Sequence, residues 1–174
     1  MKEPMSLEGY DKLIEEFKYL LEVEKPKVAH EKLVAAALGD RSENADYQAA
    51  KEKLRFIDKR LFYLNTMIQN SQIIDPSLHL HESVAFGSTV TLVDFATDNK
   101  EVYTLCGVLE SEPENRLISI HAPLAKAMLG KRVGDEIRVQ LPNQTKEYEI
   151  EKIEYKNIFS LKKSIRTKSD FSFH

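Results

Sequence analysis

Apolar residues recur at alternating spacings of three and four between positions 47 and 68, and this repeat constrains the fold more than any other feature. Such spacing is typical of the seam of a coiled coil, along which one α-helix packs against another. The seam consists of Tyr47, Ala50, Leu54, Ile57, Leu61, Leu64 and Ile68. We therefore expect one long helix here, with a partner helix packed along it.

A looser apolar stripe precedes the repeat and supplies the partner helix. It consists of Ile14, Phe17, Leu21, Val28, Ala35 and Leu38. Pro26 lies inside this stripe, and we expect a kink there because proline lacks an amide hydrogen and clashes with the preceding turn. Gly39 interrupts the pattern where a helix would stop. Two helices joined at residues 39–42 must run antiparallel, as a hairpin about 45 Å long.

The second half of the chain has a different pattern, with short segments rich in Val, Ile, Leu, Thr and Tyr that are typical of β-strands. These segments are residues 88–93, 102–109, 117–120, 136–141 and 148–155. One short helix is predicted after Pro123, and Gly130 ends it. The sequence therefore predicts an α+β chain, in which a small antiparallel sheet with one short helix follows the hairpin.

Changes in pattern predict the domain boundaries. The helical period ends at residues 73–77, so we expect a hairpin domain at 1–75, a linker at 76–79 and a second domain at 80–159. Residues 160–174 are predicted to form a flexible basic tail, because four cations face the single acid Asp170 there.

Composition excludes several classes of protein. The chain has a net charge of -3 and no run approaching the ~20 apolar residues of a membrane span. We expect no signal peptide at residues 1–4, and the single Cys106 cannot form an intrachain disulfide, so a cytoplasmic location is expected. A net acidic chain is also unsuited to coating nucleic acid by charge alone.

The hairpin turn carries two carboxylates, Asp40 and Glu43. Their spacing alone favours a structural role, with Asp40 as the N-cap of the second helix and Glu43 as its capping-box partner, which would stabilise the helix by ~1 kcal/mol. A functional role is the alternative, because a long exposed hairpin in so small a chain is typical of a probe that inserts into a partner.

Residues 39–52, which begin Gly-Asp-x-Ser-Glu-Asn-Ala-Asp-Tyr, resemble the tip signature of the Gre family of transcript-cleavage and transcription elongation factors, GreA type. The similarity extends to residues 9–10, Pro26, 84–88 and 122–135, and covers nearly the whole chain through Tyr155. It implies a coiled-coil hairpin and an FKBP-like domain that docks on polymerase. It also implies a monomeric factor that enters the secondary channel of bacterial RNA polymerase and stimulates cleavage of the backtracked RNA 3′ end, which rescues stalled complexes.

The resemblance implies that Asp40 and Glu43 are the catalytic and metal-binding carboxylates, acting on Mg²⁺ only inside the polymerase. Two carboxylates are too few ligands to hold Mg²⁺ alone, so we expect no bound metal and no nuclease activity in the isolated protein. Basic residues near the tip are implied to contact the nascent RNA 3′ end, and Lys51, Arg55 and Arg41 are the candidates. A solvated helix face is the alternative for these cations.

Two departures from the family pattern leave other functions open. Ala36 stands where the family commonly has arginine, and Arg41 stands where a hydrophobic residue is usual; both changes are predicted to alter RNA contact and pairing with Asp40. A non-catalytic Gre-like regulator in the same channel is therefore one alternative. A binding module or isomerase with the hairpin as a dimerisation arm is another.

Three further residues favour structural roles. His79 and His81 are interpreted as linker residues because a zinc site would need further His or Cys ligands nearby. Cys106 is interpreted as a small buried apolar residue, since it lies in an apolar strand.

Overall fold

The computed structural model describes residues 2–40 and 43–157 of the 174-residue chain. These residues form two compact units. The first, here called the hairpin unit, holds Tyr10–Ser71; the second, here called the sheet unit, holds Glu3–Gly9 and residues 72–157. The predicted basic tail, residues 160–174, lies outside the described part of the chain. No helix among the described residues is long and apolar enough to cross a membrane.

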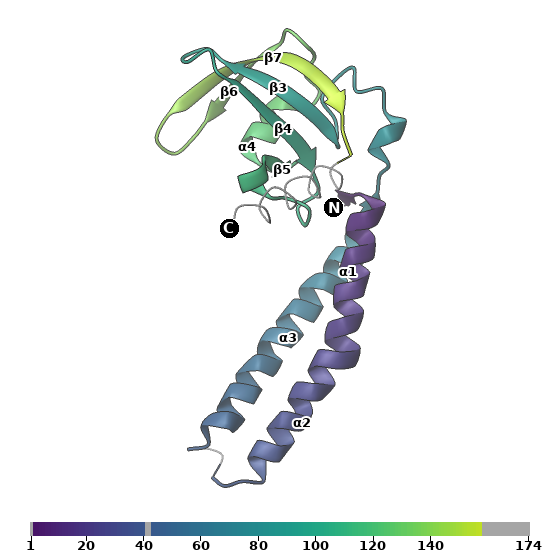
Figure 1. Cartoon of the computed structure of the whole chain (residues 1–174), viewed down its shortest axis with the longest axis vertical. Coiled ribbons are helices and arrows are strands. Elements are labelled where there is room, and N and C mark those ends of the chain that lie inside the picture. The colour runs from purple at the N-terminus through teal and green to yellow at the C-terminus, as the bar shows by residue number, and fades with distance from the viewer. Residues whose placement is uncertain (1, 41–42, 158–174) are drawn as a thin grey trace, which may run out of the picture. The chain divides into compact units, whose positions relative to one another are not determined.

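The hairpin unit consists of helices that fold back on one another (Figure 1). Helix α1 spans Leu7–Tyr19, a π-helical turn spans Leu20–Glu24, α2 spans Lys25–Ala36 and α3 spans Ala45–Asn70. Their shared core contains Val28, Ala50, Ile57 and Leu61, with Phe17, Leu20 and Leu54 packed against it. The predicted antiparallel hairpin is thus confirmed. The central residues of the seam thus pack inside one chain, whereas Tyr47, Leu54 and Ile68 are only half-buried.

The chain stays helical through Pro26, and the turn before the proline is π-helical. The Lys25 amide donates to the Leu20 carbonyl, five residues back, where an α-helix would use the residue four back. Proline at position 26 offers no amide of its own and crowds the carbonyl of Glu22. A π turn holds one more residue than an α turn, so the apolar stripe changes phase: Leu20 joins the core and Leu21 is 45% exposed. The prediction that Leu21 belongs to the packed apolar stripe of the first helix was wrong.

The last residues of the predicted stripe and of the predicted seam are also less buried than expected. Helix α2 ends at Ala36, so Leu38 lies beyond it and is 75% exposed. At the other end of the hairpin, Met67 is buried while Ile68 is only half-buried.

The sheet unit is a five-stranded sheet with the order β5-β4-β3-β7-β6. Its strands are β3 (Ser88–Asp94), β4 (Lys100–Cys106), β5 (Leu117–Ser119), β6 (Glu136–Gln140) and β7 (Thr145–Tyr155). Three neighbouring pairs are antiparallel, but β4 and β5 are parallel, so the predicted all-antiparallel sheet is wrong at this edge. The connection between β4 and β5 contains a 3₁₀ turn at Pro113–Asn115 and left-handed Arg116, with φ 58°, which return the chain in the same direction.

The core of the sheet unit lies between the sheet and the short helix α4 (Pro123–Met128) (Figure 1). Ala125 and Met128 of α4 are fully buried against apolar side chains of the strands, as the predicted helix requires. These buried strand residues are Val90, Leu92, Leu105, Ile118, Ile137, Val139, Tyr148 and Ile150. The predicted α+β fold is therefore confirmed, with a mixed sheet in place of an antiparallel one.

Two short strands were not predicted. Strand β1 (Glu3–Met5) and strand β2 (Ser71–Ile73) form a separate two-stranded sheet, and the Ile74 amide donates to the Met5 carbonyl at 2.9 Å. The segment predicted as a linker, residues 76–79, contains a 3₁₀ turn at Pro76–Leu78. The Asp75 side chain caps this turn by accepting from the Ser77 amide at 3.0 Å.

Candidate functional site

The loop between α2 and α3 carries both predicted catalytic carboxylates. Asp40 and Glu43 are exposed on this loop at the tip of the hairpin unit (Figure 1). Arg41, the third predicted tip residue, lies outside the described residues. The hairpin therefore presents two acidic side chains at the point where its two helices are joined.

Asn44, and not Asp40, is the N-cap of α3. Its side-chain oxygen accepts from the Tyr47 amide at 3.1 Å, and its side-chain nitrogen donates to the Ala35 carbonyl at 2.5 Å. The predicted capping box of Asp40 and Glu43 is thus wrong, because α3 begins at Ala45 and its N3 residue is Tyr47. The sequence signal for this role was present, since asparagine is among the residues most favoured at an N-cap.

Asn44 also joins the two helices that flank the tip. Its acceptor, Ala35, is in the last turn of α2, and its donor, Tyr47, is in the first turn of α3. One side chain therefore satisfies an amide at the start of one helix and a carbonyl at the end of the other. This arrangement fixes the two ends of the loop that bears Asp40 and Glu43.

The cations along α3 differ in their surroundings. Lys53 pairs with Glu24 at 3.2 Å, and Arg60 makes two hydrogen bonds to Glu16, at 2.7 and 2.9 Å, which raise the pKa of Arg60. Arg60 thus ties α3 to α1, and Lys53 ties it to the π-helical turn that follows α1. Such pairs support the alternative role of a solvated face at these positions.

The two predicted RNA-contact residues on α3 are Lys51 and Arg55, and both lie in the half of the helix nearer the tip. Arg55 pairs with Glu52 on its own helix at 2.6 Å, and both side chains are exposed. An exposed pair of this kind contributes ~0–1 kcal/mol, so a phosphate can displace the carboxylate at small cost. Lys51 is exposed, and no carboxylate within the described ranges forms an ion pair with it. Lys51 and Arg55 lie four residues apart and therefore share one face of α3.

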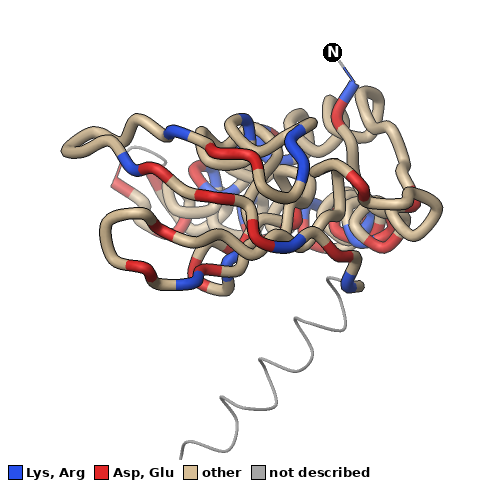
Figure 2. Tube along the Cα trace, turned by 90° about the horizontal axis from the view of Figure 1, so that it is seen from above, with Lys and Arg blue, Asp and Glu red and all other residues tan. Residues whose placement is uncertain are grey.

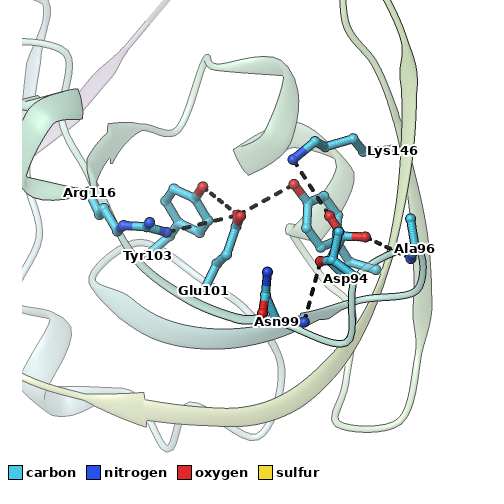
Figure 3. A network of polar contacts seen from close by, with 9 residues as sticks. Asp94, Ala96, Asn99, Glu101, Tyr103, Arg116 and Lys146 are labelled. Carbon is cyan, nitrogen blue, oxygen red and sulfur yellow. Dashed lines mark hydrogen bonds and ion pairs between the residues drawn. The ribbon is translucent and has the colours of Figure 1, made fainter.

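A polar network lies on the sheet unit, around Glu101 (Figure 3). The Glu101 carboxylate accepts from the Tyr103 hydroxyl at 2.7 Å and from the Tyr148 hydroxyl at 3.4 Å, and Arg116 lies 3.9 Å away. Burial, reinforced by the hydrogen bond to Glu101, raises the pKa of Tyr103 to about 12. A phenol with this pKa stays protonated at neutral pH, so it acts here as a hydrogen-bond donor and not as a base.

The same network borders a small pocket of about 190 Å³ whose walls include Leu124, Val139 and Leu141. Lys146 lies above the Tyr148 ring at 5.8 Å and pairs with Asp94 at 3.5 Å (Figure 3). These contacts organise the surface of the sheet unit, and Glu101, Tyr103, Lys146 and Tyr148 also line the pocket.

His81 is a buried part of the sheet unit, so its prediction as a linker residue was wrong. Its ring nitrogens lie 2.7 Å from the Ser88 hydroxyl and 2.6 Å from the Pro76 carbonyl, and its ring stacks on Tyr155. Both nitrogens are thus occupied by protein partners. No group of three or more His, Cys, Asp or Glu residues suited to a metal ion occurs in the parts of the chain that the structure describes. Cys106 is buried, as predicted.

Charges of both signs are interspersed over the described residues (Figure 2). On the strands of the sheet unit, Lys100 pairs with Glu151 at 2.6 Å and Arg138 pairs with Glu147. Such pairing prevents a large field of one sign.

An exposed helical hairpin with acidic side chains at its tip, followed by a mixed sheet with one short helix, defines a class of two-part proteins that combine a helical arm with a sheet domain. Family models place the chain within this class. The model "Transcription elongation factor, N-terminal" matches residues 3–73, and "Transcription elongation factor, GreA/GreB, C-term" matches residues 79–155. The chain belongs to the GreA/GreB family of transcription elongation factors.

Curated relatives support the same assignment. "Transcription elongation factor GreA" of Nautilia profundicola is 50% identical over 157 residues, which cover 90% of this chain and 97% of that protein. The protein of the same name from Helicobacter hepaticus is 47% identical over 156 residues, covering 90% and 96%. A solved structure, the "GreA factor homolog 1 (Gfh1) protein of Thermus thermophilus", aligns at 21% identity with a TM-score of 0.42, over 88% of this chain and 99% of that one.

Proposed function

We propose that this GreA-type elongation factor enters the secondary channel of bacterial RNA polymerase and stimulates cleavage of the backtracked RNA 3′ end. The observation that carries the proposal is that Asn44 is the N-cap of α3. Helix capping therefore does not explain why Asp40 and Glu43 are present on the loop. Two exposed carboxylates at the tip of a long hairpin are suited to a site inside a partner. The family membership and the relatives named GreA support transcript cleavage as the activity.

Asp40 and Glu43 are proposed to act on Mg²⁺ that the polymerase holds. Carboxylate oxygens suit this ion, which prefers oxygen ligands and usually keeps several of its waters. In the polymerase, the metal supplies activation of water and stabilisation of the leaving oxygen. The two carboxylates of this chain would complete the ligand set and, as hydrogen-bond acceptors, orient the attacking water. Alone they are too few for stable binding, so the isolated protein is proposed to bind no metal and cleave no RNA.

The RNA contacts are proposed to come from the face of α3 nearest the tip. Lys51 and Arg55 present their cationic groups there, where phosphates of the nascent RNA 3′ end would be attracted. Arg41, between the two carboxylates in sequence, is proposed as a third contact. We further propose that the protein is a monomer, because the central residues of the apolar seam pack within one chain, and that it acts in the cytoplasm.

The test is RNA release from a stalled, backtracked bacterial elongation complex in the presence of Mg²⁺. Wild-type protein is compared with Asp40→Asn and Glu43→Gln, which preserve shape and remove charge. Wild-type protein should accelerate cleavage, while each variant binds polymerase with unchanged affinity and loses at least ~100-fold in rate. The protein alone, incubated with naked RNA and Mg²⁺, should release no fragment.

A different result would favour the regulatory alternative. If wild type and both variants bind polymerase and change RNA extension equally, without cleavage, the carboxylates have no catalytic part. The chain would then act as a non-catalytic occupant of the channel. Polymerase binding must therefore be measured for each variant beside the cleavage rate.

A further inference from the structure

A groove of about 400 Å³ lies between α2 and α3, next to the tip loop. Its residues on α2 occur at helical spacing and form one face of that helix, and its residues on α3 are two turns apart. The lining residues are Ala29, Lys32, Leu33, Ala36, Tyr47 and Leu54. Ala36 and Tyr47 flank the loop that carries Asp40 and Glu43, so the two walls of this tip groove meet at the candidate site.

The tip groove combines an aromatic ring with a cation. The Lys32 ammonium lies 5.7 Å from the centre of the Tyr47 ring, within the range of a cation–π contact. Lys51 does not line the groove, but it follows Tyr47 by one helical turn and is therefore an exposed second cation on the same face of α3. Among the residues that the structure describes, no carboxylate lines the groove. Its charge is therefore complementary to an anionic ligand with a flat, partly apolar part.

Apolar surface in the groove is left open to solvent. Leu33 is 70% exposed, and Tyr47, Leu54 and Ala36 are only half-buried. The small side chain at position 36 leaves this space unfilled, whereas an arginine there would extend from the same helix face as Lys32. A ligand that covers Leu33 and the Tyr47 ring would gain the free energy of apolar burial.

We propose that the tip groove binds the base of a nucleotide at the extruded RNA 3′ end, stacked on Tyr47, with Lys32 and Lys51 near its phosphates. This inference rests on the proposed function, which brings the RNA 3′ end to the hairpin tip. A base has a flat π-face and an attached phosphate, which match the ring and the two cations. Lys32 thereby supplies a cation one turn before Ala36, where the family commonly has arginine.

The experiment compares cleavage in backtracked elongation complexes whose RNAs differ only at the 3′-terminal nucleotide, which is either adenosine or abasic. Factor is added at saturating concentration. With the adenosine end, Tyr47→Leu should cleave about 10-fold more slowly than wild type, as expected for loss of one base–aromatic stack, and Tyr47→Phe should keep the wild-type rate. With the abasic end, wild type and Tyr47→Leu should cleave at equal rates, because no base is left to stack.

Tyr63→Leu is the matched control. Tyr63 is also on α3 and also has a cation near its ring, with the Arg60 guanidinium at 5.4 Å, but it lies far from the tip along the helix. Its variant should cleave as wild type does on both RNAs. Far-UV circular dichroism should show equal helix content in all four proteins, which separates loss of stacking from loss of fold.

The contribution of charge is tested with Lys32→Gln. Cleavage should fall about 3-fold at low salt, and the difference should shrink at high salt because screening weakens a phosphate contact. Lys27→Gln, an exposed position on α2 outside the groove, is the matched control and should change nothing. An equal effect of both variants would overturn the role of Lys32.

Two outcomes would overturn the proposal in distinguishable ways. In the first, wild type cleaves and Asp40→Asn does not, but Tyr47→Leu slows cleavage equally on both RNAs or on neither. The groove then does not bind the base. If Tyr47→Leu also binds polymerase more weakly, the groove instead binds a side chain of the polymerase. If wild type fails to accelerate cleavage of the adenosine RNA, the proposed function fails, and the base site falls with it.

Discussion

Asn44 donates from its side-chain amide to the carbonyl of Ala35 at 2.5 Å, across the loop that separates α2 from α3. The same side chain accepts from the Tyr47 amide at 3.1 Å. The loop between these helices thus has both ends held by one residue. An amide side chain is suited to this position because it is a donor and an acceptor at once, whereas aspartate offers only acceptors at neutral pH.

Removal of Asn44 should destabilise the hairpin more than removal of either tip carboxylate. Asn44→Ala should lower the free energy of unfolding by about 1–2 kcal/mol, because it leaves the Tyr47 amide without its cap and the Ala35 carbonyl without its donor. Asn44→Asp keeps the acceptor and should cost less. Urea unfolding followed by helical circular dichroism gives these values. A larger loss for Asp40→Ala than for Asn44→Ala would restore the capping box that the structure excludes.

Gly9 should reject a methyl group, although it lies inside helix α1. A Cβ at this position would overlap the buried Glu110 carboxylate, which is held by the Ser6 hydroxyl and by the Gly107 amide at 3.1 Å. In an ordinary helix, Gly→Ala stabilises by about 1 kcal/mol. Gly9→Ala should instead destabilise the protein by about 1–3 kcal/mol through overpacking.

A double-mutant cycle isolates this contact. In a Glu110→Ala background the obstructing carboxylate is gone, so Gly9→Ala should become neutral or stabilising there. Thermal unfolding of the wild type, both single variants and the double variant provides the four values. Additive effects would show that Glu110 does not cause the cost at Gly9.

Stability should decline at alkaline pH because of Tyr103. Its pKa is raised from 10.0 to about 12 in the folded protein, chiefly by burial and then by the hydrogen bond to Glu101. The unfolded chain releases this proton first, so the stabilising contribution is complete below pH 10 and is lost as pH rises to about 12. Tyr103→Phe should therefore flatten the slope of unfolding free energy against pH in this range.

In Tyr103→Phe, the free energy of unfolding should still decline somewhat with rising pH, since burial also raises the pKa of Tyr148. The double variant Tyr103→Phe, Tyr148→Phe should have the flattest profile. Denaturant unfolding at successive pH values from about 9 to about 12 tests both statements. Parallel profiles for wild type and Tyr103→Phe would mean that the Tyr103 proton does not stabilise the folded protein.

Periodicity predicted the elements whose geometry is regular. The seam of α3 was predictable because Ala50, Ile57, Leu61 and Leu64 follow one uninterrupted helix and are all buried. Asp40 was correctly assigned to the loop for the same reason, since the two stripes locate it, whereas the predicted loop of residues 39–42 ended one residue before Glu43. Asn44 was not identified as the N-cap, because the Asp40–Glu43 spacing also fits a capping box. Only the residue at which α3 begins decides between Asp40 and Asn44 as the cap.

The features that the sequence did not predict depend on contacts between distant segments. The strands β1 and β2 have three residues each, too few for a period-2 signal. They pair with each other although the whole helical hairpin separates them in the sequence. The parallel pairing of β5 with β4 depends on the path of the chain before Leu117. His81 lies outside every named strand and helix, but Ser88, Pro76 and Tyr155 enclose it.

The π turn before Pro26 gives the last prediction, because it reverses which of two adjacent leucines stabilises the hairpin. Regular periodicity assigns Leu21 to the seam, whereas the structure packs Leu20 against the core and leaves Leu21 at 45% exposure. Leu20→Ala should lower the free energy of unfolding by about 1–2 kcal/mol, and Leu21→Ala should stay within about 0.5 kcal/mol of wild type. Both variants replace leucine by alanine, so they change helix propensity equally. Each therefore controls for the other when unfolding is measured in a urea titration. The reverse order would mean that the helix runs through Pro26 as a regular α-helix, with the stripe in the phase that the sequence alone predicts.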